Sequence, residues 1–251
     1  MIWYLSVENI KEDMDNYKTR QFFKKAQTIE PFISYDISGT KTGRLTTKKD
    51  SFPILTLDKS FRKILKPKND YFVELDFNAA ELRTLLALAG EQQPNGDIHD
   101  WNAKNVYKGL VTREEAKKRI FAWLYNPSSK DFLSSCAYKR DEVVQKYYSD
   151  GQVKTFFDRI IPSDNHHALN YIIQSTTSDL FLRQAIKVHE ALKNTKSKIV
   201  FCVHDSLVID YSSEQNSILK DLIETFSTTE LGLFKTNVSI GNNFGELRKI
   251  R

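Results

Sequence analysis

The stretch YFVELDFNAAELRTLLALAG, residues 71–90, joins an expected strand directly to an expected helix. Residues 71–77 are rich in aromatic and β-branched side chains, which favour strands. Residues 79–90 carry the apolar spacing of a helix and end at Gly90, a typical helix terminator. Asp76 lies at the join, where an acid is most often a helix cap. The stretch therefore predicts a strand-to-helix turn with a carboxylate at its mouth.

A second acid has a similar setting later in the chain. The apolar runs 198–203 (KIVFCV) and 206–211 (SLVIDY) predict a hairpin with His204 and Asp205 at its tip. An aspartate there is most often a plain turn residue. Asp76 and Asp205 could meet only if their strands lie side by side in one sheet. Paired carboxylates of this kind can hold two Mg²⁺ ions about 3.5–4 Å apart for phosphoryl transfer, so the pair suggests a two-metal site.

A third pattern lies on an expected helix that starts after Thr112, which has the capping-box spacing to Glu115. Steps of four residues place two cations and two aromatics on one stripe of this helix, namely Arg113, Lys117, Phe121 and Tyr125. Cations near a helix N-terminus suit a polyphosphate, and an exposed aromatic suits a base or a sugar. A solvated cationic face beside core aromatics explains the same spacing, and periodicity alone favours that interpretation.

Composition indicates a folded globular protein. The chain has 251 residues, which indicates one large domain or two closely packed ones. Hydrophobic residues make up 40%, and only 9 Gly and 6 Pro are present, which excludes disordered and collagen-like proteins. Residues 101–160 hold 12 Lys and Arg against 7 Asp and Glu, while the rest of the chain balances at 25 of each. The net charge of +5 therefore lies in one segment, which suggests a phosphate-binding surface or a solvated helical face.

Cysteine content and hydropathy bear on location. Cys136 and Cys202 are too few and too far apart for a disulfide framework or a thiolate zinc site, so a reducing compartment is expected. The N-terminus shows no signal-peptide pattern, and no run approaches the roughly 18 apolar residues of a membrane span. We expect a cytoplasmic protein with no membrane partner.

The remaining pattern completes a fold class. Residues 38–53 predict a loop or irregular strand, 178–192 and 219–226 predict helices, and 236–241 predict a strand. Helices that interrupt an antiparallel-looking sheet predict an α+β fold.

Several segments together resemble the motifs of the family A DNA polymerases, the bacterial polymerase I kind. LDFNAAELR (75–83) resembles motif A, REEAKKRIFAWLY (113–125) resembles the fingers helix, and VHDS (203–206) resembles motif C. Four further segments resemble family motifs in the family's order: TKTGRLTT (40–47), GDIH (96–99), NYIIQSTTSDL (170–180) and VSIGNNFGEL (238–247). Each is weak alone, but the ordered series is specific.

The resemblance implies an antiparallel palm sheet, a helical fingers subdomain and template-directed addition of dNTPs to primer–template DNA. Asp76, Asp205 and the carbonyl of Phe77 would bind two Mg²⁺ ions. Residues that would contact the nucleotide are His99, Arg113, Lys117, Phe121, Tyr125 and Glu81. Among these, Lys117 would also protonate pyrophosphate, and Glu81 would be the steric gate against a ribose. Residues that would contact primer or template are Arg44, Asn170, Gln174 and His204.

One departure keeps alternatives open. Ser206 stands where DNA-polymerising members usually carry Glu, and the related single-subunit RNA polymerases have the same His-Asp-Ser. An RNA-synthesising or primase-like enzyme is therefore one alternative, and an inactive nucleic-acid-binding subunit is another. Retention of Asp76, Asp205, Arg113 and Lys117 argues against the inactive form.

The expected organisation is an N-terminal extension of unassigned role (1–35), palm (36–98), fingers (99–165) and palm again (166–251). Complete family members carry a helical thumb, and usually an exonuclease domain, before the TKTGRLTT-like segment, and only about 37 residues precede it here. We expect both to be absent from this chain. The sequence therefore predicts a second polypeptide that supplies a thumb, an exonuclease or both, as in a split phage enzyme acting in the host cytoplasm.

Overall fold

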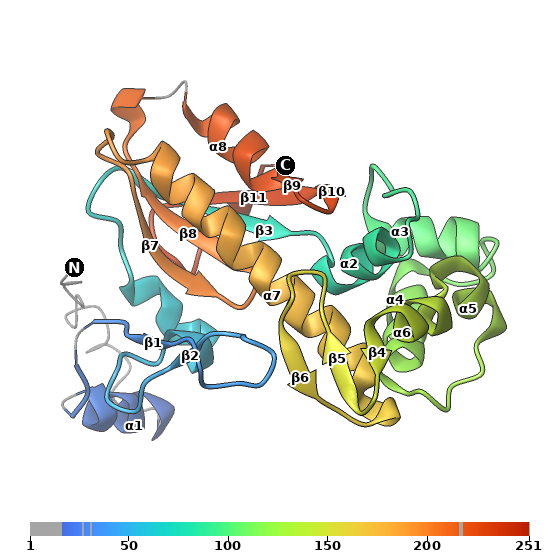
Figure 1. Ribbon diagram of the computed structural model, residues 1–251. Coiled ribbons are helices and arrows are strands. Elements are labelled where there is room, and N and C mark those ends of the chain that lie inside the picture. The colour runs from blue at the N-terminus through green and yellow to red at the C-terminus, as the bar shows by residue number, and fades with distance from the viewer. Residues whose placement is uncertain (1–16, 27, 31, 216–217, 251) are drawn as a thin grey trace.

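The computed structural model describes residues 17–26, 28–30, 32–215 and 218–250 (Figure 1). Its centre is a five-stranded antiparallel sheet with the order β12-β11-β3-β8-β7. The strands are β3 (Tyr71–Phe77), β7 (Lys198–Val203), β8 (Ser206–Tyr211), β11 (Thr236–Gly241) and β12 (Arg248–Lys249). The central strand is β3, so strands that are more than 120 residues apart in sequence become neighbours.

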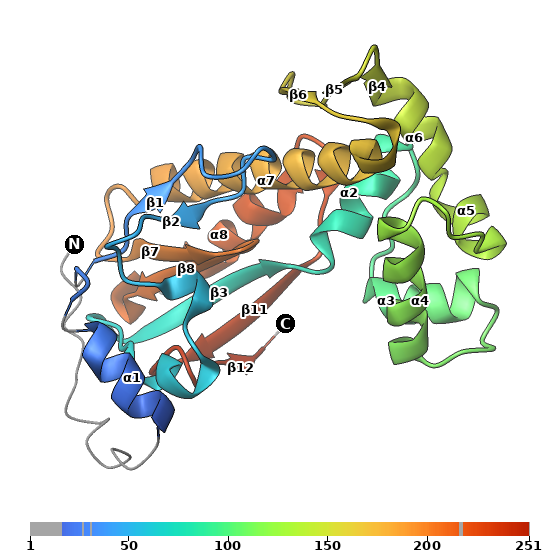
Figure 2. The same ribbon diagram turned by 90° about the horizontal axis from the view of Figure 1, so that it is seen from below.

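Two helices cover one face of this sheet, α7 (Asn165–Ala191) and α8 (Ile218–Ser227) (Figures 1 and 2). Every second residue of β3 points into this layer, and Val73, Leu75 and Phe77 are almost fully buried there. The intervening residues Glu74 and Asp76 project from the opposite face, where both are half-buried. The same face carries Phe72, which is fully buried in a separate apolar cluster. One face of β3 is therefore apolar throughout, and the other passes from an apolar start to two acids.

A second, mostly helical part packs around its own core (Figure 2). Its elements are α2 (Ala80–Leu88), α3 (Ile98–Trp101), a π-helical turn (Asn102–Val106), α4 (Arg113–Tyr125), α5 (Phe132–Tyr138), α6 (Arg140–Tyr147) and the small sheet of β4 (Tyr148–Ser149), β5 (Gln152–Lys154) and β6 (Ile160–Pro162). Trp123 and Tyr138 are fully buried at its centre.

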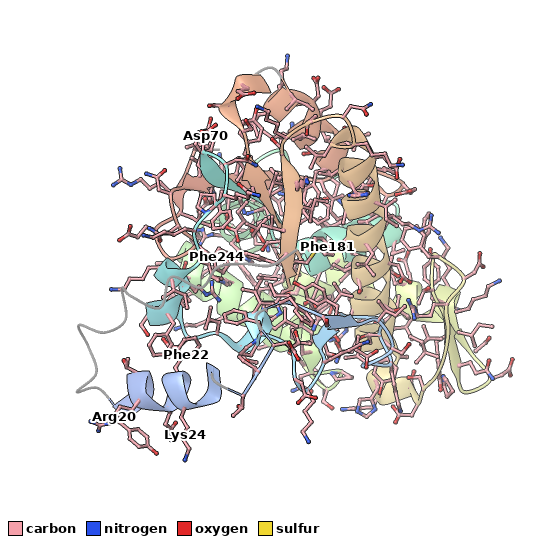
Figure 3. All side chains as sticks on the ribbon, turned by 90° about the vertical axis from the view of Figure 1, so that its left-hand side faces the viewer. Arg20, Phe22, Lys24, Asp70, Phe181 and Phe244 are labelled. Carbon is pink, nitrogen blue, oxygen red and sulfur yellow. The ribbon has the colours of Figure 1, made fainter. Side chains whose placement is uncertain are left out.

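The N-terminal region forms a third layer beside the sheet. It comprises α1 (Tyr17–Ala26), β1 (Tyr35–Asp36), β2 (Thr46–Thr47) and two 3₁₀ turns (Ile54–Thr56 and Lys59–Ile64). Phe22 of α1 stacks on Phe61 with ring centroids 4.7 Å apart, while Arg20 and Lys24 point outward (Figure 3). Near the other terminus lie a 3₁₀ turn (Ser213–Gln215) and the short hairpin of β9 (Thr228–Thr229) and β10 (Gly232–Leu233).

The predicted α+β fold is confirmed, and so are the expected strands 71–77 and 236–241 and the hairpin around His204 and Asp205. The capping box at Thr112 is present, with both hydrogen bonds to Glu115 formed. Asp76 is not a helix cap, because the N-cap of α2 is Ala79.

One predicted helix was too short. The helix expected over 178–192 is the last half of α7, which begins at Asn165. The polar run Ser175–Ser178 hid its continuation, because Ser and Thr are weak helix formers. All four side chains are buried in the fold, and two of them make tertiary hydrogen bonds: Thr177 donates to Thr84 (2.8 Å) and Ser178 donates to the carbonyl of Gly43 (2.8 Å).

Arg83 ties the strand-to-helix turn to the loop that leads into α3. Its fully buried guanidinium donates to the Asn78 carbonyl (2.8 Å) and side-chain oxygen (3.0 Å), and to the carbonyls of Pro94 (2.8 Å) and Gly96 (2.7 Å). A planar fork of donors is required to reach all four acceptors.

We expect Arg83→Lys to lower the free energy of unfolding by about 2–3 kcal/mol, because an ammonium leaves some of these buried oxygens unsatisfied. Urea denaturation measures the change. Arg248→Lys at an exposed position is the control and should change stability by less than about 0.5 kcal/mol. Equal stability of the two variants would contradict the role given to Arg83.

Candidate active site

Asp76 and Asp205 lie at one end of the paired strands β3 and β8. Asp76 is opposite Ser206 in the register, and Asp205 immediately precedes Ser206 in the turn. Neighbouring strands are about 4.8 Å apart, so the two acids share one end of the sheet. Burial, and then the negative charge of Asp205, raise the pKa of Asp76 to about 7, although Asn237 donates to its Oδ2 (3.1 Å). Burial also raises the pKa of Asp205.

A residue in the left-handed backbone region lies close to each of the two acids, in the turn after Asp76 and in the turn that contains Asp205. Ala79 has φ 48°, and His204 has φ 55° at the first position of the two-residue turn between β7 and β8. Side chains with a Cβ are strained in this region, by roughly 1–2 kcal/mol each, and such strain is typical of functional sites.

A cavity of about 290 Å³ opens beside Asp205. The side chains that line it include Arg44, Glu81, Ser178, His204 and Asp205. Arg44 and Glu81 form an ion pair, in which Glu81 is largely buried and Arg44 is half-exposed. Gly43, which precedes Arg44, has φ +75°, and a Cβ there would lie 2.6 Å from the guanidinium of Arg159. The loop that carries Arg44 is thus held closely against its neighbours.

The four-residue stripe of α4 faces away from the core. Ala116, Ile120 and Trp123 form the buried face of this helix, so the predicted stripe is a surface. Phe121 is half-buried and Tyr125 is 42% exposed, and their rings stack nearly parallel with centroids 5.9 Å apart. Tyr125 is therefore a surface residue, whereas Phe121 also packs against the core of the helical part, so the interpretation as core is wrong for Tyr125 alone. Lys117 is exposed on the same stripe.

Asp97 connects the stripe of α4 to the acid-bearing turn, a connection that sequence reasoning missed. Its carboxylate accepts from Arg113 (2.9 Å), from Asn78 (3.2 Å) and from the backbone of His99 (2.9 Å). Partial burial opposes its ionisation, but these donors hold the pKa of Asp97 far below its usual range. Its place within the GDIH segment was the available signal, since Asp is a favoured helix N-cap.

His99 is buried between α3 and α4. Its ring lies 5.7 Å from that of Phe121, and among the described residues its Nδ1 has no hydrogen-bond partner. Burial, with the cations Arg113 and Lys117, lowers the pKa of His99, so a neutral ring is favoured. A neutral imidazole retains one nitrogen as an acceptor.

Asn170 and Gln174 lie one behind the other on α7. Gln174 donates to the side-chain oxygen of Asn170 (2.7 Å). Ser178, which lines the cavity, lies one helical turn after Gln174 and two turns after Asn170. The structure thus places them in a row that leads to the cavity.

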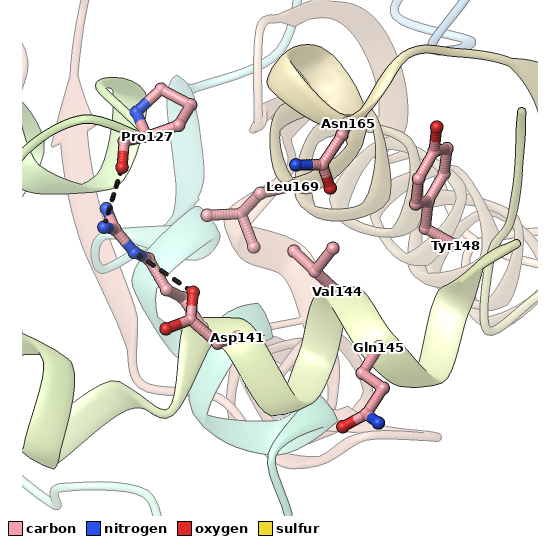
Figure 4. A pocket seen from close by; sticks show the side chains of 8 residues that line it. Pro127, Asp141, Val144, Gln145, Tyr148, Asn165 and Leu169 are labelled. Atoms are coloured by element: carbon pink, nitrogen blue, oxygen red, sulfur yellow. Dashed lines mark hydrogen bonds and ion pairs between the residues drawn. The ribbon is translucent and has the colours of Figure 1, made fainter.

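Another cavity, of about 400 Å³, lies between α6 and the start of α7 (Figure 4). Arg140 at its edge donates to the carbonyls of Trp123 (2.7 Å), Pro127 (3.1 Å) and Ser129 (2.9 Å). These bonds fix the segment that follows α4. No predicted site residue lines this cavity among the described residues.

The described residues lack a preformed metal cluster and a membrane-spanning helix. They contain no group of three or more His, Cys, Asp or Glu side chains arranged to hold a metal ion. Within the same residues, no helix has the length and hydropathy needed to cross a membrane.

Comparison with known proteins points to one family. Residues 158–246 match the model described as DNA polymerase family A. The chain is similar to DNA polymerase I of Caldicellulosiruptor bescii (26% identity, over 74% of this chain and 28% of the relative) and of Borreliella burgdorferi (24%, over 94% and 31%). It therefore spans less than a third of the length of these relatives.

A solved structure shares the fold. The polymerase domain of Pol1 from M. smegmatis, in complex with DNA primer–template and dNTP, superposes with a TM-score of 0.72. The match has 17% sequence identity and covers 90% of this chain and 51% of that one.

The pKa of Asp76 predicts that the metal-free protein loses stability as pH rises. The folded value of about 7 exceeds the ordinary value of 3.8, so the folded state holds this proton more tightly and is favoured at low pH. Between pH 4 and 7 the contribution of this group falls by up to about 4 kcal/mol. Urea denaturation in the presence of EDTA, at pH 5 and at pH 8, measures the free energy of unfolding. Asp76→Asn should remove most of the fall between these two pH values. Exposed Asp221→Asn is the control, and a native-like pH dependence in Asp76→Asn would refute the shift.

Strain at His204 predicts a stability gain on substitution. His204→Gly should raise the free energy of unfolding by about 1 kcal/mol, because glycine adopts positive φ without a Cβ clash. Thermal unfolding measures the change in stability. His189→Gly, within the regular helix α7, is the control and should lower stability. A loss of stability in His204→Gly would show that contacts of the imidazole outweigh the strain.

Proposed function

We propose that this chain is the part of a family A DNA polymerase that carries the catalytic centre for template-directed addition of deoxynucleotides to a primer 3′-hydroxyl. The family-model match and the similarity to DNA polymerase I relatives support this proposal. The observation that carries this proposal is the meeting of Asp76 and Asp205 at one end of β3 and β8, beside the cavity that contains Arg44 and Glu81. Paired carboxylates of this kind can hold the two metal ions of a phosphoryl-transfer site.

The donor set at this end of the sheet fits Mg²⁺. Carboxylate oxygens and a backbone carbonyl are the hard ligands that this ion prefers, and Mg²⁺ sites commonly use one or two carboxylates with water and substrate phosphates. Burial disfavours the charged form of both acids, and the negative charge of Asp205 further disfavours ionisation of Asp76. A bound cation would offset these costs. We propose that Asp76, Asp205 and the carbonyl of Phe77 hold two ions. When bound, these would activate the primer hydroxyl and stabilise the charge of the leaving pyrophosphate.

The nucleotide would extend from the acids toward α4. Lys117 is exposed and could bind the triphosphate directly, and it would supply a proton to pyrophosphate. Arg113 would share its guanidinium between Asp97 and a phosphate, with His99 beside it. The stacked pair Phe121 and Tyr125 would pack against the sugar and base.

The Arg44–Glu81 ion pair supports a choice of sugar. Glu81 is 13% exposed and fixed by Arg44 at the cavity wall. We propose that this anchored carboxylate fills the space that a ribose 2′-hydroxyl needs. Asn170 and Gln174 on α7, and Arg44 and His204 at the cavity, would contact primer or template.

The proposed organisation assigns residues 36–98 and 166–251, which include the five-stranded sheet, α2 and α7, to the palm. It assigns residues 99–165, from α3 to β6, to the fingers. The two DNA polymerase I relatives are more than three times as long as the regions that match this chain. We propose that a second polypeptide supplies duplex-holding or exonuclease functions.

Primer extension on a primed template, with dNTPs or NTPs and Mg²⁺, tests the function. We expect the native chain to incorporate dNTPs. The incorporation rate should fall at least about 10³-fold in Asp76→Asn and in Asp205→Asn, while DNA binding is retained. Glu81→Ala should gain the ability to incorporate NTPs. Asp221→Asn is the matched control. A native preference for NTPs would favour the RNA-synthesising alternative, and DNA binding without incorporation would favour the inactive subunit.

A further inference from the structure

A third acid, Glu74, lies on the acidic face of β3. It is two residues before Asp76, and the alternation of the strand places both on the face opposite Val73 and Leu75. In the register Glu74 is opposite Val208, and Asp76 is opposite Ser206. Ser206 is therefore the diagonal cross-strand neighbour of Glu74, a spacing that long side chains can bridge.

Ser206 links Glu74 to the proposed metal centre. Its side chain is nearly buried, and its Oγ lies 3.1 Å from Oε1 of Glu74, to which it donates. The serine follows Asp205 directly and pairs with Asp76. The carboxylate of Glu74, on β3, therefore lies against Ser206 on β8, next to both aspartates.

The hydroxyl does not need this acid. Ser206 Oγ also lies 3.1 Å from the carbonyl oxygen of Val203, which would satisfy its single proton. A half-buried carboxylate next to two others carries a cost in repulsion and desolvation. The cation near Glu74 is Arg62, but the structure shows no ion pair between them among the described residues. Arg62 favours the charged form of Glu74, but burial and the negative charge of Asp205 oppose it. A cation bound between the acids would stabilise all three charges.

We propose that Glu74 is a positioning residue of the metal centre, and that it supplies from β3 the third negative charge beside Asp76 and Asp205. This inference rests on the proposed function. Glu74 is not grouped with the aspartates as a preformed three-ligand site. It would instead orient a metal-bound water and Ser206 from the outer shell, where losing a partner typically weakens metal affinity about 10–100-fold.

Metal binding provides a test that does not depend on turnover. Mn²⁺ titration followed by electron paramagnetic resonance would compare the native chain with Glu74→Gln, Glu74→Asp and the double variant Glu74→Gln/Ser206→Glu. The double variant moves the charge across the strands to position 206. Glu224→Gln, on the exposed side of α8, is the matched control. Thermal unfolding in EDTA checks that each variant folds.

We expect Glu74→Gln to weaken Mn²⁺ binding about 10-fold or more, and the double variant to recover to within about 3-fold of native. Glu74→Asp should fall between them, and Glu224→Gln should match the native chain. An Mn²⁺ affinity of Glu74→Gln within twofold of the native value overturns the inference. So does a loss of Mn²⁺ affinity in folded Glu74→Gln that the double variant Glu74→Gln/Ser206→Glu does not recover.

Primer extension separates this inference from the proposed function. If the native chain extends primers and Glu74→Gln binds Mn²⁺ as tightly as the native chain does, the role of Glu74 is overturned and the proposed function stands. A native chain that neither binds Mn²⁺ nor extends primers would overturn both.

Discussion

The antiparallel pairing of β3 with β8 is the constraint on which the rest of the molecule depends. Its register sets Asp76 opposite Ser206 and brings Asp205 to the same end. The register is held by the apolar face, where Leu75 and Leu207 are fully buried beneath α7 and α8. A slip of one residue would expose these leucines and bury Glu74 and Asp76, so the core enforces the geometry of the acids.

The acidic end of the sheet is costly for folding. Half-buried carboxylates repel one another, and Ala79 and His204 hold left-handed backbone conformations beside them. The stabilising contacts lie elsewhere, in the apolar layer and in bonds such as those of Arg83 to the turn. This division is typical of a site whose arrangement is selected for chemistry and compensated by the surrounding fold.

A continuous set of hydrogen bonds joins the two parts of the molecule. Asn78 follows the acid-bearing end of β3 and donates to Asp97, and Asp97 pairs with Arg113 at the start of α4. Arg83 binds Asn78 from the other side. Movement of α4 would therefore act on the turn after Asp76 through two polar residues, which connects the cationic stripe physically to the acids.

The sequence by itself determined the local structure: strand 71–77, the turn into α2, the capped start of α4 and the hairpin around Asp205. These follow from two-residue and helical periodicity, from capping spacing and from turn chemistry, all of which act over a few residues. It also indicated the acids and the stripe of α4, but not whether Phe121 and Tyr125 are core or surface. Only the tertiary structure decided that, together with the pairing of β3 with β8, the length of α7 and the approach of Glu74 to Ser206. These depend on contacts between residues far apart in the chain, where packing and register outweigh local preference.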